Sequence, residues 1–167
     1  SLLIKKVHDT YQPDLFGTLF GVTEGLIDFR RQAGYELAWV SASRGSRTGE
    51  PAALMIAPQS DRARKLLASL RLQLARDLPI QLALFASGRR LLLSVELKER
   101  LLRGLNLEPD PLELPLHLNR VAAYLWGPRT FESSVSDIIR FVHTHQSQLQ
   151  RLPQADQQLI NSRVIAG

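Results

Sequence analysis

The sequence contains no cysteine, which excludes a disulfide scaffold, a thiolate metal site and a cysteine nucleophile. Aromatic residues make up only 7% of the chain, and this scarcity argues against a protein that reads single-stranded nucleic acid mainly by stacking. No apolar run approaches the roughly 18 residues of a membrane-spanning helix. Residues 1–9 also lack the apolar core and the cleavage site of a secretion signal, so we expect a cytoplasmic protein without a membrane segment.

The remaining composition is that of a folded protein. Of the 167 residues, 44% are apolar and 22% are charged, which is typical of globular domains and excludes wholesale disorder. The chain begins at Ser1, without a methionine, and enters an apolar pattern at once, as if it started inside a helix. We therefore expect a fragment of a longer protein.

The formal net charge of +5 is concentrated in the middle of the chain. Residues 61–103 contain ten basic and four acidic side chains, whereas residues 1–60 are balanced and residues 104–167 are slightly acidic. Of the 21 basic residues, 17 are arginine, whose planar guanidinium suits phosphate. A clustered, arginine-rich surface indicates a polyanion partner such as nucleic acid, although a solvated helix face would produce the same charge pattern.

The periodicity of apolar residues predicts an α+β fold in two parts, residues 1–58 and residues 59–167. In the first part, Thr23 is placed to cap the N-terminus of a helix, and Gly34 is placed to end that helix. In the second part, leucines recur every three or four residues, which is typical of amphipathic helices. The predicted strands cover residues 15–20, 35–40 and 52–57, and the predicted helices cover residues 2–7, 23–33, 61–78, a shorter segment from Pro79, 91–105, 116–125, 131–149 and a short stretch after Pro153.

One segment of the first part resembles a known superfamily. A strand, a capped helix and then Arg31-Gln-Ala-Gly-Tyr-Glu36, leading into another strand, resemble the C-terminal motif of the GNAT acyltransferases. The entry Phe20-Gly-Val-Thr23 and the hairpin with the long loop 41–50 are similar to one branch, the bacterial tRNA(Met) cytidine acetyltransferases. Residues 121–131 resemble the tail domain of that branch. The resemblance implies the end of a GNAT domain, a βαββ unit, followed by a mainly helical tRNA-binding domain.

The resemblance also implies an activity. The family uses acetyl-CoA and ATP to acetylate N4 of the wobble cytidine of tRNA(Met). Its phosphate-binding loop, G-x-x-x-x-G-K-[ST], is missing from this sequence, and so is the Gln/Arg-x-x-Gly-x-Gly/Ala loop that would hold the acetyl-CoA pyrophosphate. We therefore expect the chain by itself neither to bind acetyl-CoA tightly nor to catalyse transfer, and we assign no catalytic residue.

In the resembled family, the helix after Phe-Gly-x-Thr offers a Glu and later an Arg to the cofactor. The matching positions here hold Gly25 and Gln32, whereas Glu24 and Arg31 stand one residue earlier, a rotation of ~100° on a helix. Either the register is shifted or these contacts are lost. The weak candidate contacts to acetyl-CoA are Gly21, Thr23, Glu24, Gly25, Arg31 and Gln32.

The charge pattern and the resemblance together predict a cationic surface that binds tRNA phosphates without reading sequence. Two alternatives stay open. One is a GNAT-derived protein-interaction module without catalysis, which would expose an apolar stripe within residues 91–105 or 112–125. The other is a GNAT acetyltransferase with another substrate. The candidate RNA-binding residues are Arg44, Arg47, Arg62, Arg64, Lys65, Arg71, Arg89 and Arg90.

Other residues that could carry chemistry form no recognisable site in the sequence. His143 and His145 would point ~200° apart on a helix, so we expect no shared metal ion. Trp39 and Trp126 each lie in an apolar run, and we therefore expect both in the core rather than on a surface that stacks bases.

Overall fold

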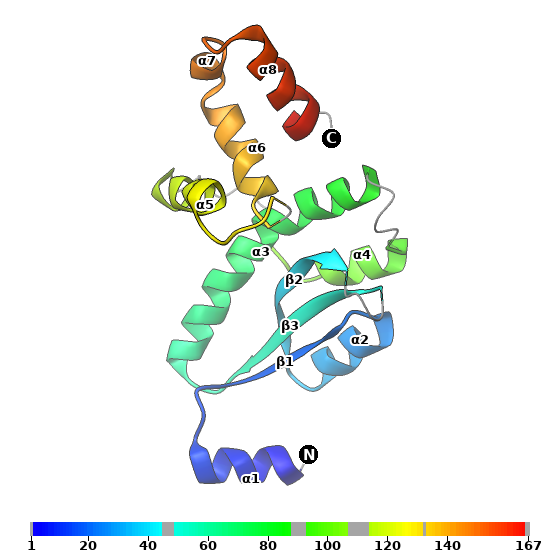
Figure 1. The fold of residues 1–167 in the computed structure, drawn as a ribbon. Coiled ribbons are helices and arrows are strands. Elements are labelled where there is room, and N and C mark those ends of the chain that lie inside the picture. Colours follow the sequence, from blue (N-terminus) through cyan, green and yellow to red (C-terminus); the bar gives the residue numbers. More distant parts are fainter. Residues whose placement is uncertain (1, 45–48, 88–92, 107–113, 132, 166–167) are drawn as a thin grey trace. The chain divides into compact units, whose positions relative to one another are not determined.

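The computed structural model describes residues 2–44, 49–87, 93–106, 114–131 and 133–165 (Figure 1). They form an α+β protein with a small three-stranded sheet. The chain divides into two compact units, which we call unit 1 (residues 1–75 and 95–106) and unit 2 (residues 76–94 and 107–167). This division does not fall at residue 58, because the first half of a long helix and a later short helix belong with the sheet.

Unit 1 contains the strand–helix–strand–strand order that the sequence predicts. Strand β1 (Leu15–Gly21) is followed by helix α2 (Glu24–Gln32) and by the hairpin strands β2 (Glu36–Arg44) and β3 (Pro51–Pro58). All pairings are antiparallel and the spatial order is β1-β3-β2, so β3 is the central strand. Helix α1 (Leu2–Tyr11) precedes β1 (Figure 1). The predicted α+β class is confirmed, whereas the GNAT assignment stays a prediction.

Local signals define both ends of α2. Thr23 has an extended backbone, and its hydroxyl oxygen accepts a hydrogen bond from the Leu26 amide at 3.4 Å, as an N-cap residue does. Gly34 has a φ of +83°, the left-handed conformation in which glycine commonly ends a helix. Between these ends Ile27 is fully buried, as is Met55 of β3. Each such side chain contributes about 1.5–3 kcal/mol of apolar burial to the stability of unit 1.

Helix α3 (Asp61–Ser87) follows the sheet and is shared between the two units. Its first half contributes Leu67 to a core cluster that includes Ile56 of β3. The sequence predicts a new segment from Pro79, and this prediction is wrong, because α3 runs through Pro79 without ending. Proline has no backbone N–H, so the carbonyl of Ala75 lacks its usual helical donor. The division between the units falls directly after Ala75.

The remaining helices are short. Helix α4 (Val95–Leu102) belongs to unit 1 and is shorter than the predicted helix over 91–105, of which residues 91–92 lie outside the described part. In unit 2 the predicted helix over 131–149 is interrupted at His145. Within the described ranges, none of the helices combines the length and the apolarity needed to cross a membrane. The elements of unit 2 after α3 are α5 (Leu114–Trp126), α6 (Val135–Thr144), α7 (Gln146–Leu149), α8 (Gln154–Ile160) and the π-helical turn η1 (Asn161–Ile165).

Both tryptophans contradict the sequence analysis, which places them in the core. Trp39 is 46% exposed and Trp126 is 84% exposed. Trp39 lies on the edge strand β2, and the pairing of β2 with β3 shifts by one residue between Leu37 and Trp39. Trp126 is the last residue of α5 and precedes Gly127, where a Cβ atom would lie 2.7 Å from the Ala123 carbonyl oxygen. An apolar run in the sequence does not reveal the shift in strand pairing at Trp39. It also does not reveal that the end of α5, where Trp126 lies, faces solvent.

Candidate functional site

The candidate cofactor residues of α2 lie against helix α4. The Arg100 guanidinium of α4 is 3.1 Å from a carboxylate oxygen of Glu24 and 2.9 Å from one of Asp28. In the opposite direction, the Arg31 guanidinium donates hydrogen bonds to the carbonyl oxygens of Arg100 at 2.8 Å and Arg103 at 3.0 Å. The hydrogen bond from Arg100 lowers the pKa of Asp28, and burial lowers the pKa of Arg31. Side chains that the resemblance assigns to a ligand therefore hold α4 in place.

Helix electrostatics explains why Arg31 points to the end of α4. The last carbonyls of a helix have no intrahelical donor and carry partial negative charge, which attracts cations. Arg71 of α3 adds a second cation at the same end, because its guanidinium donates to the carbonyl of Gly104 and lies 3.1 Å from Glu36. Gly104 itself has a φ of +76°, so glycine again follows the end of a helix.

The other candidate cofactor residues have local roles or face solvent. Gly21 is the last residue of β1, and Thr23 caps α2. Gly25 and Gln32, the positions in the family's own register, are exposed. In the shifted register, Glu24 and Arg31 are bound by α4, as described above. Acetyl-CoA binding by these residues stays a prediction.

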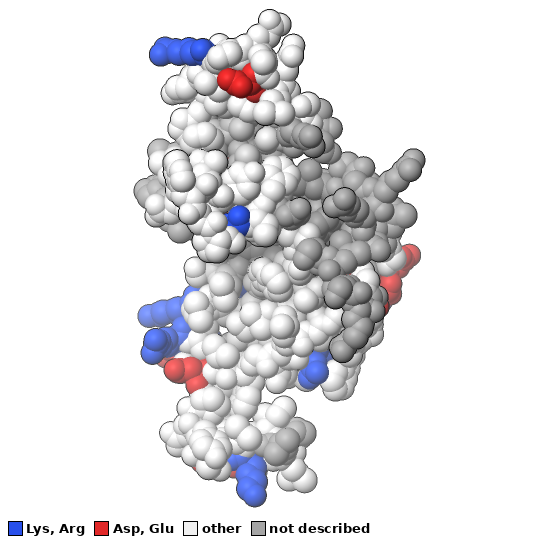
Figure 2. All heavy atoms as spheres, viewed as in Figure 1, with Lys and Arg blue, Asp and Glu red and all other residues white. Residues whose placement is uncertain are grey.

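The candidate RNA-binding residues separate into different environments. Arg62, Arg64 and Lys65 are exposed in the first turns of α3, where Figure 2 shows basic side chains beside acidic ones. Arg64 pairs with Asp61 at 2.8 Å. Arg71 belongs to the contacts at the end of α4. Three further candidates lie outside the described residues, namely Arg47, Arg89 and Arg90. The side chain of Arg44 lies outside the described part as well.

Unit 2 contains a cluster of buried charges that the sequence analysis did not identify. Asp77 of α3 is 5% exposed, lies 3.0 Å from the Arg120 guanidinium and accepts a hydrogen bond from the Ser136 hydroxyl at 2.8 Å. Asp137 of α6 is 2% exposed and lies 2.9 Å from Nε of the same arginine. Arg140 lies 3.9 Å from Asp77 and donates to the carbonyl of Arg76 at 2.6 Å. Together these groups tie α3, α5 and α6 to one another.

Burial controls the electrostatics of this cluster. It raises the pKa of Asp137 to about 6, with the Arg120 guanidinium opposing the shift and the Asp77 carboxylate adding to it. Burial likewise lowers the pKa values of Arg129 and Arg140. A carboxyl with a raised pKa can act as a general acid, but here both carboxylates contact arginines of neighbouring helices. The contacts identify a structural cluster.

A signal for this cluster is present in the sequence. Asp77 lies between Leu74 and Leu78 in the apolar stripe of α3, and Asp137 lies between Val135 and Ile138 in that of α6. Because an isolated buried carboxylate is costly, a charged residue inside an apolar stripe indicates a buried partner. The sequence does not identify that partner, which is 43 positions away for Asp77 and Arg120.

The histidines form no metal site in the described part of the chain, where no group of three or more His, Asp or Glu side chains could hold an ion. His143 is exposed, whereas His145 is partly buried. The His145 ring stacks on that of Phe141, with 4.3 Å between the ring centres, and its Nδ1 lies 3.0 Å from the Phe141 carbonyl oxygen.

Comparisons with known proteins do not place the chain in a family. No protein-family model matches it, and no curated protein matches it.

Replacing Arg31 should loosen α4. Arg31→Ala removes two hydrogen bonds from a charged donor, so we expect the amides of Val95–Leu102 to exchange with solvent about thirtyfold faster, given roughly 1 kcal/mol for each hydrogen bond. Hydrogen–deuterium exchange with mass spectrometry measures this effect. Gln32→Ala, on the exposed neighbour, is the control and should leave α4 protected. Equal protection in both variants would show that Arg31 does not hold α4.

Proposed function

We propose that the chain is the C-terminal part of a cytoplasmic tRNA(Met) cytidine acetyltransferase of the GNAT superfamily, and that it mainly contributes tRNA binding. The observation that carries the proposal is the agreement between motif and structure in unit 1. The Phe20–Glu36 segment forms the end of a strand, a helix capped by Thr23 and ended by Gly34, and the start of the next strand. The order β1-α2-β2-β3 is the βαββ order that the resemblance implies.

The binding step depends on exposed cations. Within the described residues, Arg62 and Lys65 are exposed on the first turns of α3 and make no ion pair, so their charges are available to phosphates. Contacts of this kind position a nucleic acid without reading its sequence. They also release condensed counterions, so the affinity for tRNA should fall steeply as the salt concentration rises.

The acetyl-transfer step requires groups that this sequence does not supply. In the proposed reaction the exocyclic amine of cytidine attacks the thioester carbonyl of acetyl-CoA, and hydrogen-bond donors stabilise the oxyanion that develops. The C–S bond then breaks, and CoA leaves as the thiol with the proton that the amine loses. The loop that would hold the acetyl-CoA pyrophosphate is missing, and α4 binds Glu24 and Arg31. We therefore expect the chain alone to bind tRNA but not to transfer acetyl groups, and ATP to act on another part of the enzyme.

Charge reversal on α3 tests the proposal. We expect the double variant Arg62→Glu/Lys65→Glu to bind tRNA roughly tenfold more weakly than the unmodified chain at low salt, with a smaller dependence of affinity on salt. Fluorescence anisotropy with labelled tRNA, titrated between about 50 and 200 mM salt, measures both quantities.

The matched control changes the same number of charges on another exposed helix. Lys5→Glu/Lys6→Glu alters the net charge equally, on α1. If the two double variants lose affinity equally, tRNA responds to net charge alone and the first turns of α3 are not its binding surface. If the unmodified chain does not bind tRNA, or binds it without dependence on salt, the proposed function is wrong.

A protein-interaction module is the second candidate, because α5 carries the apolar surface that this alternative predicts. Leu118 and Leu125 are seven positions apart, which places them on one face of α5, and both are exposed. Trp126 adds a large exposed ring at the end of the same helix. Chromatography with light scattering separates the candidates: concentration-dependent self-association that Trp126→Ser abolishes, together with no affinity for tRNA, would favour the interaction module.

A further inference from the structure

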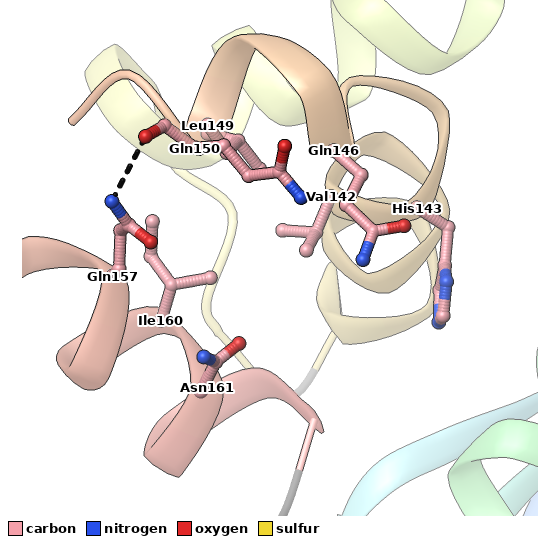
Figure 3. Close-up of a pocket in the computed structure, with 8 residues that line it drawn as sticks. All are labelled: Val142, His143, Gln146, Leu149, Gln150, Gln157, Ile160 and Asn161. Carbon is pink, nitrogen blue, oxygen red and sulfur yellow. Dashed lines mark hydrogen bonds between the residues drawn. The ribbon is translucent and has the colours of Figure 1, made fainter.

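Unit 2 contains a small cavity whose lining is rich in side-chain amides (Figure 3). It has a volume of about 160 Å³ and is lined by residues of α6, α7, α8 and η1. Val142, Leu149 and Ile160 supply its apolar part. The amide side chains among its lining residues are Gln146, Gln150, Gln157 and Asn161.

The lining specifies the charge of a ligand. His143 is the sole titratable side chain among the residues that line the cavity, and none of these residues is Lys, Arg, Asp or Glu. A phosphate, a carboxylate or a metal ion would find no countercharge there. An uncharged ligand with hydrogen-bonding groups on one edge and an apolar body suits amides beside aliphatic side chains.

One hydrogen-bond acceptor of the cavity has a fixed orientation. The Gln157 side-chain nitrogen donates to the carbonyl oxygens of Gln150 at 3.0 Å and Leu152 at 2.7 Å. These two acceptors orient the amide, so that its oxygen lies on the side away from both carbonyls. Figure 3 shows this oxygen on the Ile160 side of the Gln157 amide, and the Gln146 amide beside Val142 and His143; Asn161 also lines the cavity. A ligand would therefore meet an oriented acceptor beside two amides that can donate or accept.

The volume limits the size of the ligand. A protein cavity of about 150 Å³ can hold one benzene molecule, whereas pockets for drug-sized ligands begin near 300 Å³. At about 160 Å³ the cavity suits a single six-membered ring rather than a whole nucleotide or a coenzyme. Among the components of RNA, the pyrimidine bases meet this limit, are uncharged and carry adjacent donors and acceptors. Side-chain amides are established partners of base edges, and bases splayed out of an RNA loop are accessible to them.

We propose that this cavity binds one unstacked pyrimidine base of RNA, read by Gln146, Gln157 and Asn161. The inference rests on the proposed function, in which exposed cations of the chain bind the phosphates of tRNA. It adds a contact to one base of the same RNA. The cavity then adds a preference for an RNA whose single-stranded loop can place a pyrimidine in it.

The direct test uses small probes on the whole chain. Cytidine, uridine, adenosine and ribose 5-phosphate are titrated separately, and the side-chain amide resonances of Gln146, Gln157 and Asn161 are followed by NMR. We expect shifts with cytidine or uridine, smaller shifts with adenosine and none with ribose 5-phosphate. The proposal is overturned if neither pyrimidine nucleoside shifts these resonances, if adenosine shifts them as much, or if ribose 5-phosphate does so.

Two variants of the same helix provide the matched comparison. Gln146 and Gln148 are both exposed, but Gln146 lines the cavity, whereas Gln148 is not among the lining residues and accepts a hydrogen bond from Ser147 within α7. Gln146→Leu should weaken binding of the pyrimidine nucleoside at least fivefold, and Gln148→Leu should not change it; equal effects would exclude the cavity. The tRNA titration separates the two proposals: salt-dependent tRNA binding without nucleoside binding removes only the cavity, and nucleoside binding without tRNA binding removes only the proposed function.

Discussion

Replacement of Asp77 by alanine should destabilise unit 2 by about 3–5 kcal/mol, the usual cost of removing one partner from a buried ion pair. Asp77 is 5% exposed and is the carboxylate that both Arg120 and Arg140 approach, at 3.0 and 3.9 Å. Without it, the guanidinium groups of Arg120 and Arg140, on side chains that are 14% and 17% exposed, face one remaining carboxylate, that of Asp137. The Ser136 hydroxyl also loses its acceptor. The cost arises from uncompensated charge rather than from lost packing.

Urea denaturation followed by circular dichroism measures the loss, and hydrogen exchange in α5 and α6 assigns it to unit 2. Asp156→Ala, an exposed carboxylate of α8, is the control and should change stability by less than about 0.5 kcal/mol. Comparable stability of the two variants would show that Asp77 does not hold the helices of unit 2 together.

The second large effect is a dependence of stability on pH that originates in Asp137. Its pKa rises from 3.8 in the unfolded chain to about 6 in the folded chain, because burial disfavours the charged form. A raised folded-state pKa means that the folded chain binds the proton more tightly. The contribution of the protonated Asp137 carboxyl to the free energy of unfolding is therefore fully present below pH 3.8 and is lost as the pH rises through about 6. At roughly 1.4 kcal/mol per pKa unit, it amounts to about 3 kcal/mol.

Asp137→Asn tests this dependence, because asparagine resembles the protonated carboxyl in shape and does not titrate. Other charged groups face the same site, namely Arg120, Asp77, Arg129 and Arg140, and they are unchanged in the variant. We expect the difference in unfolding free energy between variant and parent to move in favour of the variant between pH 4 and pH 7, as measured by urea denaturation at each pH. A difference that stays constant over this range would mean that the Asp137 carboxyl does not titrate with a raised pKa.

The contrast between the two aspartates shows what sequence patterns could and could not predict. The N-cap Thr23 and the terminating Gly34 were predicted, because both act on backbone groups a few positions away. The partners of Asp77 and Asp137 were not, because Arg120 belongs to a different helix from either aspartate, beyond the reach of a local pattern. The arginine-rich window predicted a cationic surface, yet Arg71 from that window contacts Glu36 and the end of α4. A charge count cannot separate an arginine that serves the fold from one that is available to a ligand.

Some predictions of helix boundaries were wrong for similar reasons. Pro79 was expected to begin a new segment, although a helix held by other contacts can pass through a proline at the loss of one hydrogen bond. The exposed positions of Trp39 and Trp126 depend on a shift in strand pairing and on the side of α5 that faces solvent. Such features follow from tertiary packing, and periodicity carries no information about them.

The two units alternate along the sequence, and this order has a consequence for biosynthesis. Unit 1 is not contiguous in sequence: its first stretch ends at residue 75, the chain then supplies residues 76–94 to unit 2, and residues 95–106 return with α4. While a ribosome is still extending the polypeptide through residue 90, Arg31 lacks its carbonyl acceptors, and Glu24 and Asp28 lack their cationic neighbour. In a nascent polypeptide that ends at residue 75, these polar groups have no partner from α4. Unit 1 can therefore be completed only after residues 95–106 are synthesised, which is after the first segment of unit 2, residues 76–94.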